Sequence, residues 1–135
     1  MKIGIIGLGV VGNACKFGFE KNGHNVKVHD IKLNTSISDV LATEIVFICV
    51  PTPESRDGSC DTSIVESVIS ELHSVSYKGH IAIKSTVAPG TTDKLSTLLG
   101  TQVSFVPEFL RERCAITDFT EHHDVCMIGT HSDDA

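Results

Sequence analysis

Three glycines near the N-terminus have the spacing of a phosphate-binding loop. Gly7, Gly9 and Gly12 form the pattern GxGxxG in the segment GLGVVG. In such a loop the first glycine permits a tight turn, the second lets a pyrophosphate approach the backbone, and the third lets helix and strand pack closely. The following helix directs free amides at the phosphates. A flexible turn is the alternative, but a strand before and a helix after favour phosphate binding, with Val10 and Val11 also in contact.

Asp30 stands where an acid that binds a ribose is expected. It follows Gly12 by 30 − 12 = 18 residues, close to the usual separation of about twenty. A carboxylate at this position accepts a hydrogen bond from the adenosine ribose and repels a 2′-phosphate, which favours NAD over NADP. Lys32 is the nearest cation, and we expect it at the same site. The alternative is that Asp30 only begins a turn.

The surrounding segments alternate between strand and helix patterns. Strands are expected at 2–6, 25–29, 44–50, 80–84, 103–106 and 124–128, and helices at 10–21, from Asp61 or Ser63 onward, and at 91–99. A short, weakly helical segment is expected at 37–42, and Ser63-x-x-Glu66 has the pattern of a capping box. The alternation predicts an α/β fold of the Rossmann type: a doubly wound, mainly parallel six-stranded sheet with helices on both faces.

Length and composition exclude several classes of protein. The 135 residues suit one domain spanning 1–135, and 41% hydrophobic with 21% charged residues excludes a disordered chain. A net charge of −6 argues against nucleic-acid binding through a basic face. No apolar run reaches the roughly 20 residues of a membrane span, and no secretory signal is recognisable. We expect a cytoplasmic protein without membrane contact.

The cysteines and histidines do not form a metal-binding pattern. The five cysteines are an odd number with scattered spacing and no CxxC, so reduced, mostly structural thiols are expected and no metal site. The adjacent pair His122-His123 is best explained as a solvated pair before a strand.

Further segments resemble one enzyme family. They are CVPTP at 49–53 followed by DGSCDTS, KSTVAPGTT at 84–92, and PEFLRE at 107–112. Together with the glycine loop they are similar to the N-terminal NAD-binding domain of the UDP-glucose/GDP-mannose dehydrogenase family, in the family's order and over essentially all 135 residues. Val10 departs from the pattern, because the family usually has tyrosine there. The departure leaves the glycines undisturbed.

The resemblance implies a reaction and a division of labour. Such enzymes oxidise C6 of a nucleotide sugar, a UDP- or GDP-hexose, from alcohol to carboxylate and reduce two NAD per turnover. The family's nucleophilic cysteine and catalytic lysine lie in later regions, and nothing in this sequence matches either motif. We therefore expect the N-terminal part of a longer, homodimeric dehydrogenase. These residues alone are expected to be monomeric and to bind NAD without turnover.

The same resemblance implies which residues meet the cofactor. Val50, Pro51 and Thr52 correspond to the adenosine and ribose side, and Ser85, Thr86 and Val87 to the nicotinamide half. Both segments follow predicted strands, at the edge where doubly wound sheets bind ligands. Helix capping before Pro89 is the alternative role for Ser85 and Thr86, and it is compatible with cofactor contact.

The PEFLRE segment carries the implied catalytic group. By resemblance Glu108 is the active-site glutamate, and Glu112 contacts cofactor or substrate. A carboxylate beside the reacting carbon can accept a proton directly or through water, which Thr86 would hold. The resemblance also places Phe109, Leu110 and Arg111 at the substrate. From spacing alone, Glu108 and Glu112 fit a solvated helix face, although the preceding proline and the apolar residues between them favour a site-facing turn.

Two other residues invite catalytic roles. Cys114 lies close to PEFLRE, but no family cysteine matches it, which favours a packed thiol. Lys84 is interpreted as a charge at a strand end rather than as a substitute for the catalytic lysine. Two other functions remain open: an NAD-binding sensor or interaction module without catalysis, and a hydroxyacid dehydrogenase, against which PEFLRE argues.

Overall fold

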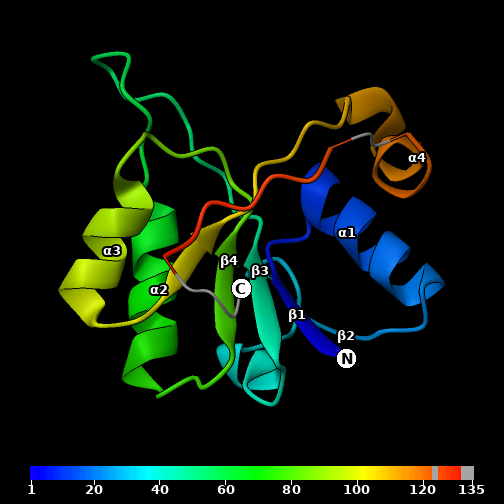
Figure 1. Cartoon of the computed structure of the whole chain (residues 1–135), viewed down its shortest axis with the longest axis horizontal. Coiled ribbons are helices and arrows are strands. Elements are labelled where there is room, and N and C mark those ends of the chain that lie inside the picture. Colours follow the sequence, from blue (N-terminus) through cyan, green and yellow to red (C-terminus); the bar gives the residue numbers. More distant parts are fainter. Residues whose placement is uncertain (123–124, 132–135) are drawn as a thin grey trace.

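A computed structural model describes residues 1–122 and 125–131 and contains one parallel sheet. Its strands are β1 (Lys2–Ile6), β2 (Asn25–His29), β3 (Ile45–Ile48), β4 (His80–Ile83) and β5 (Val103–Phe105), in the order β2-β1-β3-β4-β5. The helices are α1 (Val10–Lys21), α2 (Ser63–Ser74), α3 (Thr91–Leu99) and α4 (Ala115–Thr120), with 3-10 turns η1 (Ile37–Val40) and η2 (Glu112–Cys114). Helices α2 and α3 lie on one side of the sheet and α1 and α4 on the other (Figure 1), which confirms the predicted Rossmann-type fold.

Within the described residues the sheet has five strands, so the predicted sixth strand is not found there. Residues 125–128 form no strand, and residue 124 lies outside the described residues. Only Gly129 joins the sheet, through an isolated antiparallel bridge to Phe105 in which each amide donates to the other's carbonyl. The apolar side chains of this segment remain more than half exposed, at 62% for Val125, 54% for Met127 and 51% for Ile128. Hydrophobic residues without a surface to cover do not establish a strand.

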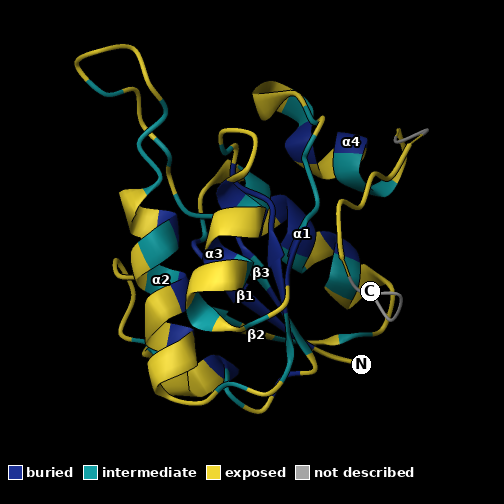
Figure 2. Ribbon diagram, turned by 60° about the vertical axis from the view of Figure 1, so that its left-hand side comes forward, coloured by how far each residue is buried: buried dark blue, intermediate teal, exposed yellow. Residues whose placement is uncertain are grey.

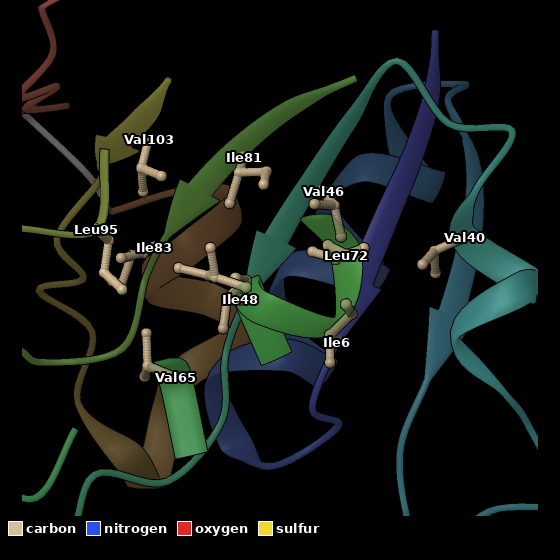
Figure 3. Packing of buried hydrophobic residues seen from close by; sticks show 11 residues of the cluster. Ile6, Val40, Val46, Ile48, Val65, Leu72, Ile81, Ile83, Leu95 and Val103 are labelled. Carbon is tan, nitrogen blue, oxygen red and sulfur yellow. The ribbon is translucent and has the colours of Figure 1, made fainter. Parts of the chain in front are cut away.

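The core lies between the sheet and helix α2. Alternate residues of the strands point to this face, and the α2 stripe of Val65, Ile69 and Leu72 packs on them. Figure 3 shows the side chains of Ile48 and Ile83 directed into the same cluster. In Figure 2 the central strands β1 and β3 are largely buried, while the outer faces of α2 and α3 are exposed. Because the strands are parallel and packed in this way, their carboxyl ends lie side by side along one edge of the sheet.

Helix α2 begins differently from the predicted capping box. Thr62, not Ser63, is its N-cap residue. The Glu66 carboxylate accepts hydrogen bonds from the Thr62 hydroxyl at 2.9 Å and from the Lys94 ammonium at 3.0 Å, while Asp61 accepts the amide of Ser63 at 2.9 Å. The first turn is thus closed by the residues immediately before it.

The opposite face of the sheet is covered by α1, on which α4 packs closely. Gly18 is buried, and a Cβ there would lie 2.5 Å from the ring of Phe119. The ring of Phe19 stacks on Phe47 of β3 and meets Phe119 edge-on. This seam joins the helix that follows the glycine loop to the helix that follows the PEFLRE segment.

Truncating Leu72 tests the core. We expect Leu72→Ala to lower the free energy of unfolding by about 2–5 kcal/mol, because the side chain is fully buried against the sheet. Leu98→Ala is the matched control: Leu98 is 69% exposed, so its loss should change stability by less than about 0.5 kcal/mol. Urea unfolding followed by circular dichroism measures both variants, and equal effects would contradict the assigned core.

Candidate functional site

A cleft of about 1030 Å³ opens at the carboxyl edge of the sheet. The strand order reverses between β1 and β3, which is where open α/β sheets bind ligands. Segments that follow all five strands contribute to its lining. Among the residues predicted from the sequence it includes Gly7, Gly9, Val10, Val11, Asp30, Lys32, Val50, Pro51, Thr52, Ser85, Thr86, Glu108, Leu110 and Glu112. The structure therefore brings most of the predicted site residues together.

The three glycines of the loop have different surroundings. Gly7 has φ +93°, and a Cβ there would lie 2.6 Å from the carbonyl oxygen of Cys49. A Cβ on Gly12 would collide with the carbonyl oxygen of Gly7, whereas one on Gly9 would meet nothing within 4 Å. Gly7 and Gly12 are therefore required by the close approach of β1, α1 and the end of β3. Gly9 leaves open space above the backbone, on the side where a ligand would approach.

Asp30 connects the end of β2 to the glycine loop. Its Oδ2 accepts the amide of Leu8 at 2.6 Å and its Oδ1 accepts the amide of Lys32 at 2.8 Å. These two bonds, the Leu8 bond first, hold the pKa of Asp30 below its ordinary value. The side chain both begins a turn and supports the loop. Each oxygen retains lone pairs that a ribose hydroxyl can use.

The three predicted residues after β4, namely Ser85, Thr86 and Val87, lie in different surroundings. Ser85 is buried, and its hydroxyl donates to the carbonyls of Val50 at 2.7 Å and Ile48 at 3.2 Å. It therefore fixes the end of β3 rather than capping a helix. Thr86 is exposed in the cleft. Val87 packs against the core and is not among the residues that line the cleft.

The segment after β5 presents Glu108 and Glu112 without a helix between them. Residues 106–111 are irregular and only Glu112 begins the η2 turn, so the pair does not form a solvated helix face. The Glu108 Oε1 accepts the amide of Phe109 at 2.9 Å. The Oε2 is buried, makes no hydrogen bond of good geometry within the described residues, and lies 2.8 Å from the Lys84 ammonium.

Two residues of PEFLRE point away from the cleft. Phe109 is 63% exposed and lines a second cavity, of about 730 Å³, between α1, α4 and the other face of the sheet. The Arg111 guanidinium binds Asp118 at 2.8 and 3.0 Å, and its amide donates to the same carboxylate. This pairing holds the pKa of Asp118 well below its ordinary value. Arg111 thus anchors the segment to α4.

Sequence analysis missed two contributions to the cleft. Helix α2 adds Ser63, Ile64, Ser67, Val68 and Glu71. The cleft also contains the thiol of Cys49, which was not among the predicted site residues. A hydrogen bond with Cys15 and, second, burial raise the pKa of Cys49 well above its ordinary value, which keeps the thiol protonated and weakly nucleophilic. Two signals in the sequence marked its place: the predicted strand 44–50 and the family segment CVPTP at 49–53.

Cys114 does not belong to the cleft. Its thiol donates to Asp118 at 3.4 Å, and it lines neither cavity. Among residues 1–122 and 125–131, no group of three His, Cys, Asp or Glu side chains is arranged to hold a metal ion. No helix in the same ranges is long and apolar enough to cross a membrane.

The family model for the UDP-glucose/GDP-mannose dehydrogenase family, NAD binding domain, matches residues 31–135. The chain belongs to this family. A UDP-glucose 6-dehydrogenase of Rhizobium meliloti is 37% identical over 105 residues, covering 70% of this chain and 24% of that protein. A GDP-mannose 6-dehydrogenase of Pseudomonas aeruginosa is 34% identical over 95 residues, covering 59% of this chain and 22% of that protein.

Solved structures of the family share the fold over nearly the whole chain. A UDP-glucose dehydrogenase from Pyrobaculum islandicum has a TM-score of 0.87 and 27% identity, covering 98% of this chain and 41% of its own. A GDP-mannose dehydrogenase from Pseudomonas aeruginosa, solved as a ternary complex, has a TM-score of 0.85 and 26% identity, covering 99% and 42%. The structural match includes the glycine loop, which precedes the range of the family model. The chain spans less than half of the length of these relatives.

NAD is the cofactor of this family domain, and the cleft fits it. The open space above Gly9 suits a pyrophosphate, and α1 begins directly behind it with no acidic residue in its first turn. Asp30 lies beside the loop as an ionised acceptor.

Substituting Gly9 separates ligand binding from folding. We expect Gly9→Val to weaken NAD binding at least tenfold, about 1.4 kcal/mol, because its side chain enters the open space, where a Cβ meets no protein atom within 4 Å. Gly12→Val is the contrasting variant and should unfold the chain, since its Cβ overlaps the Gly7 carbonyl. Calorimetric titration and circular dichroism measure the two effects. Native affinity in folded Gly9→Val would contradict the phosphate-loop assignment.

Asp30 is expected to set the preference between the two nicotinamide cofactors. The native chain should bind NAD more tightly than NADP, and Asp30→Ala should narrow the difference by on the order of 1–3 kcal/mol by removing an acceptor and a repulsion. Asp57→Ala is the matched control, because Asp57 makes a similar turn bond to the amide of Ser59 in an exposed loop. Equal NAD and NADP affinities in the native chain, measured calorimetrically, would refute the assignment.

Proposed function

We propose that this chain is the NAD-binding part of a nucleotide-sugar 6-dehydrogenase. The substrate is a UDP- or GDP-hexose, and its C6 alcohol is oxidised to a carboxylate with two NAD. The observation that carries the proposal is that Thr86, Glu108 and Glu112 line the same cleft as the glycine loop and Asp30. Proton-accepting and cofactor-binding groups therefore share one space at the carboxyl edge of the sheet. Family membership and the names of the relatives support the same activity.

The cofactor-binding roles follow the order of the strands. In this proposal the glycine loop binds the pyrophosphate, and Asp30 with Lys32 binds the adenosine ribose. Val50, Pro51 and Thr52 face the adenosine side. Thr86 and Glu112 reach the nicotinamide half, while Ser85 and Val87 act indirectly, because Ser85 is bonded to β3 carbonyls and Val87 packs on the core.

Glu108 is the proposed proton acceptor. When NAD is bound, it supplies the acceptor for the hydride that leaves C6. Glu108 then takes the proton of the C6 hydroxyl, directly or through a water held by the Thr86 hydroxyl. Leu110 and Glu112 flank the substrate from the same segment. Phe109 and Arg111 keep this segment in place, since Arg111 is bound to Asp118 of α4.

The second oxidation needs a thiolate to hold the substrate as a thioester. The thiols of this region do not suit the role, since Cys49 is held protonated and Cys114 lies outside the cleft. Cys60 does not line the cleft either, and its thiol donates to the Thr86 carbonyl at 3.5 Å. We infer that the nucleophile and the catalytic lysine belong to a longer protein, of which the relatives are examples. That protein is proposed to be a cytoplasmic homodimer, and this chain alone is proposed to be a monomer.

An activity assay tests this assignment. We expect these 135 residues to bind NAD but to form no NADH from UDP-glucose or GDP-mannose, because positioning by the remaining domain supplies about 7–11 kcal/mol of the barrier reduction. The full-length gene product should form two NADH per nucleotide sugar consumed, measured by absorbance across a panel of UDP- and GDP-sugars.

Two variants make the assay decisive. Turnover by the short chain that disappears in Cys114→Ser or Cys49→Ser would mean that it carries its own nucleophile. NAD binding without turnover by the full-length product over the whole panel would overturn the dehydrogenase assignment in favour of an NAD-binding sensor.

A further inference from the structure

Lys84 is a buried lysine directly beneath the proposed proton acceptor. The residue is 7% exposed, and its Nζ lies 2.8 Å from Glu108 Oε2. The other neighbours of Nζ are the carbonyl oxygen of Val106, at 3.5 Å, and the ring of Phe119, whose centroid is 5.7 Å away. The ammonium is therefore enclosed by a carboxylate, a carbonyl and an aromatic ring face, which are the groups that stabilise a cation away from water.

The backbone holds Lys84 at the centre of the site. Its amide donates to the carbonyl of Ile48 at 2.9 Å, which continues the pairing of β3 with β4. Lys84 and Glu108 line both the cleft and the second cavity. The ion pair thus forms part of the wall between the two spaces. A lysine that only carried charge at a strand end would project into solvent. For comparison, the side chain of Lys94 on helix α3 is 59% exposed.

Resting on the function proposed above, we propose that Lys84 is the positioning residue for Glu108: its ammonium balances the charge of the buried carboxylate and directs the side chain to the cleft. A carboxylate has about four acceptor positions. The Phe109 amide uses one of them, on Oε1, and the Lys84 ammonium lies against the other oxygen as its counter-charge. Acceptor positions therefore remain for a water or a substrate hydroxyl at the cleft.

The other titratable groups near the pair do not replace the lysine. Cys49, at the end of β3, is held protonated. Asp118 on α4 is already bound by Arg111, and Glu112 on η2 is exposed. His80, at the opposite end of β4, is bonded to Ser104, and burial lowers its pKa. The remaining titratable groups of the two cavities are Lys21, His29, Asp30, Lys32, Glu71, His122 and Cys126, all of which are exposed except the half-buried His29 and Asp30.

Removing the lysine should neutralise the glutamate. The Glu108 side chain is only 16% exposed, and a carboxylate left in such a place without a counter-charge takes up a proton. In Lys84→Met at pH 7 we expect the infrared band of a protonated carboxyl, which should disappear in Lys84→Met/Glu108→Gln. Lys84→Arg should not show the band. Neither should the matched control Lys94→Met, whose partner Glu66 belongs to an exposed pair.

This measurement needs neither cofactor nor turnover. A folded Lys84→Met variant without the band would overturn the proposal. If Lys84→Met does not fold, Lys84→Met/Glu108→Gln decides: recovery of the native circular dichroism spectrum supports the pairing, and failure to recover contradicts it. NAD binding by the native chain and turnover by the native full-length product test the proposed function separately.

The kinetic consequence is measured in the full-length product with NAD and the nucleotide sugar that it oxidises. We expect Lys84→Met to lower kcat about 100-fold, the range for loss of a general base, with a smaller change in KM and with part of the rate regained as the pH rises. Lys84→Arg should restore at least a tenth of the native rate, and Lys94→Met should equal the native protein. A pH profile of unchanged shape in Lys84→Met would show a merely structural role and overturn the proposal.

Discussion

The close approach of three backbone segments at the carboxyl edge of the sheet governs the rest of the structure. The turn after β1, the start of α1 and the end of β3 meet where Gly7 and Gly12 would each collide with a carbonyl group if they carried a Cβ. Because no side chain separates these segments, α1 can begin directly against the sheet and direct its free amides into the cleft. The same approach places Cys49 and the residues after β3 opposite the loop. The position of the cleft is thus a consequence of packing at two glycines.

The elements that form this frame could be predicted because they depend on local patterns. Strand β2 and helices α1 and α3 follow from apolar periodicity and from glycine at their ends, and the observed bounds agree with the prediction. The segment 124–128 has the same apolar character, yet its described residues form no strand. An apolar run shows that a segment can be buried but not that a surface is available to bury it. The proline before Glu108 and the apolar residues after it indicated a turn facing the cleft, where helical spacing alone suggested an exposed face.

The partners of polar side chains could not be predicted in the same way. Asp30 accepts the amide of Leu8 across 22 residues, and Ser85 donates to carbonyls more than 30 residues earlier. Lys84 was interpreted as a strand-end charge, because a lysine that ends a strand usually reaches solvent. Its burial depends on β5 and α4, which close over it from later in the chain. Such contacts depend on the tertiary arrangement. They can be read from a structure, or inferred from a resemblance to a family whose structure is known.

The seam between α1 and α4 links the two halves of the site. The ring of Phe119 rests on Gly18, leaving no room for even a methyl group, and the same helix α4 holds Arg111 through Asp118. Helix α1, which begins at the phosphate loop, therefore packs directly on helix α4. Helix α4 in turn anchors the segment that carries Glu108. During evolution, a larger residue at position 18 would therefore require a smaller residue at position 119. The residue types at positions 18 and 119 should therefore vary together among related proteins, although neither residue lines the cleft.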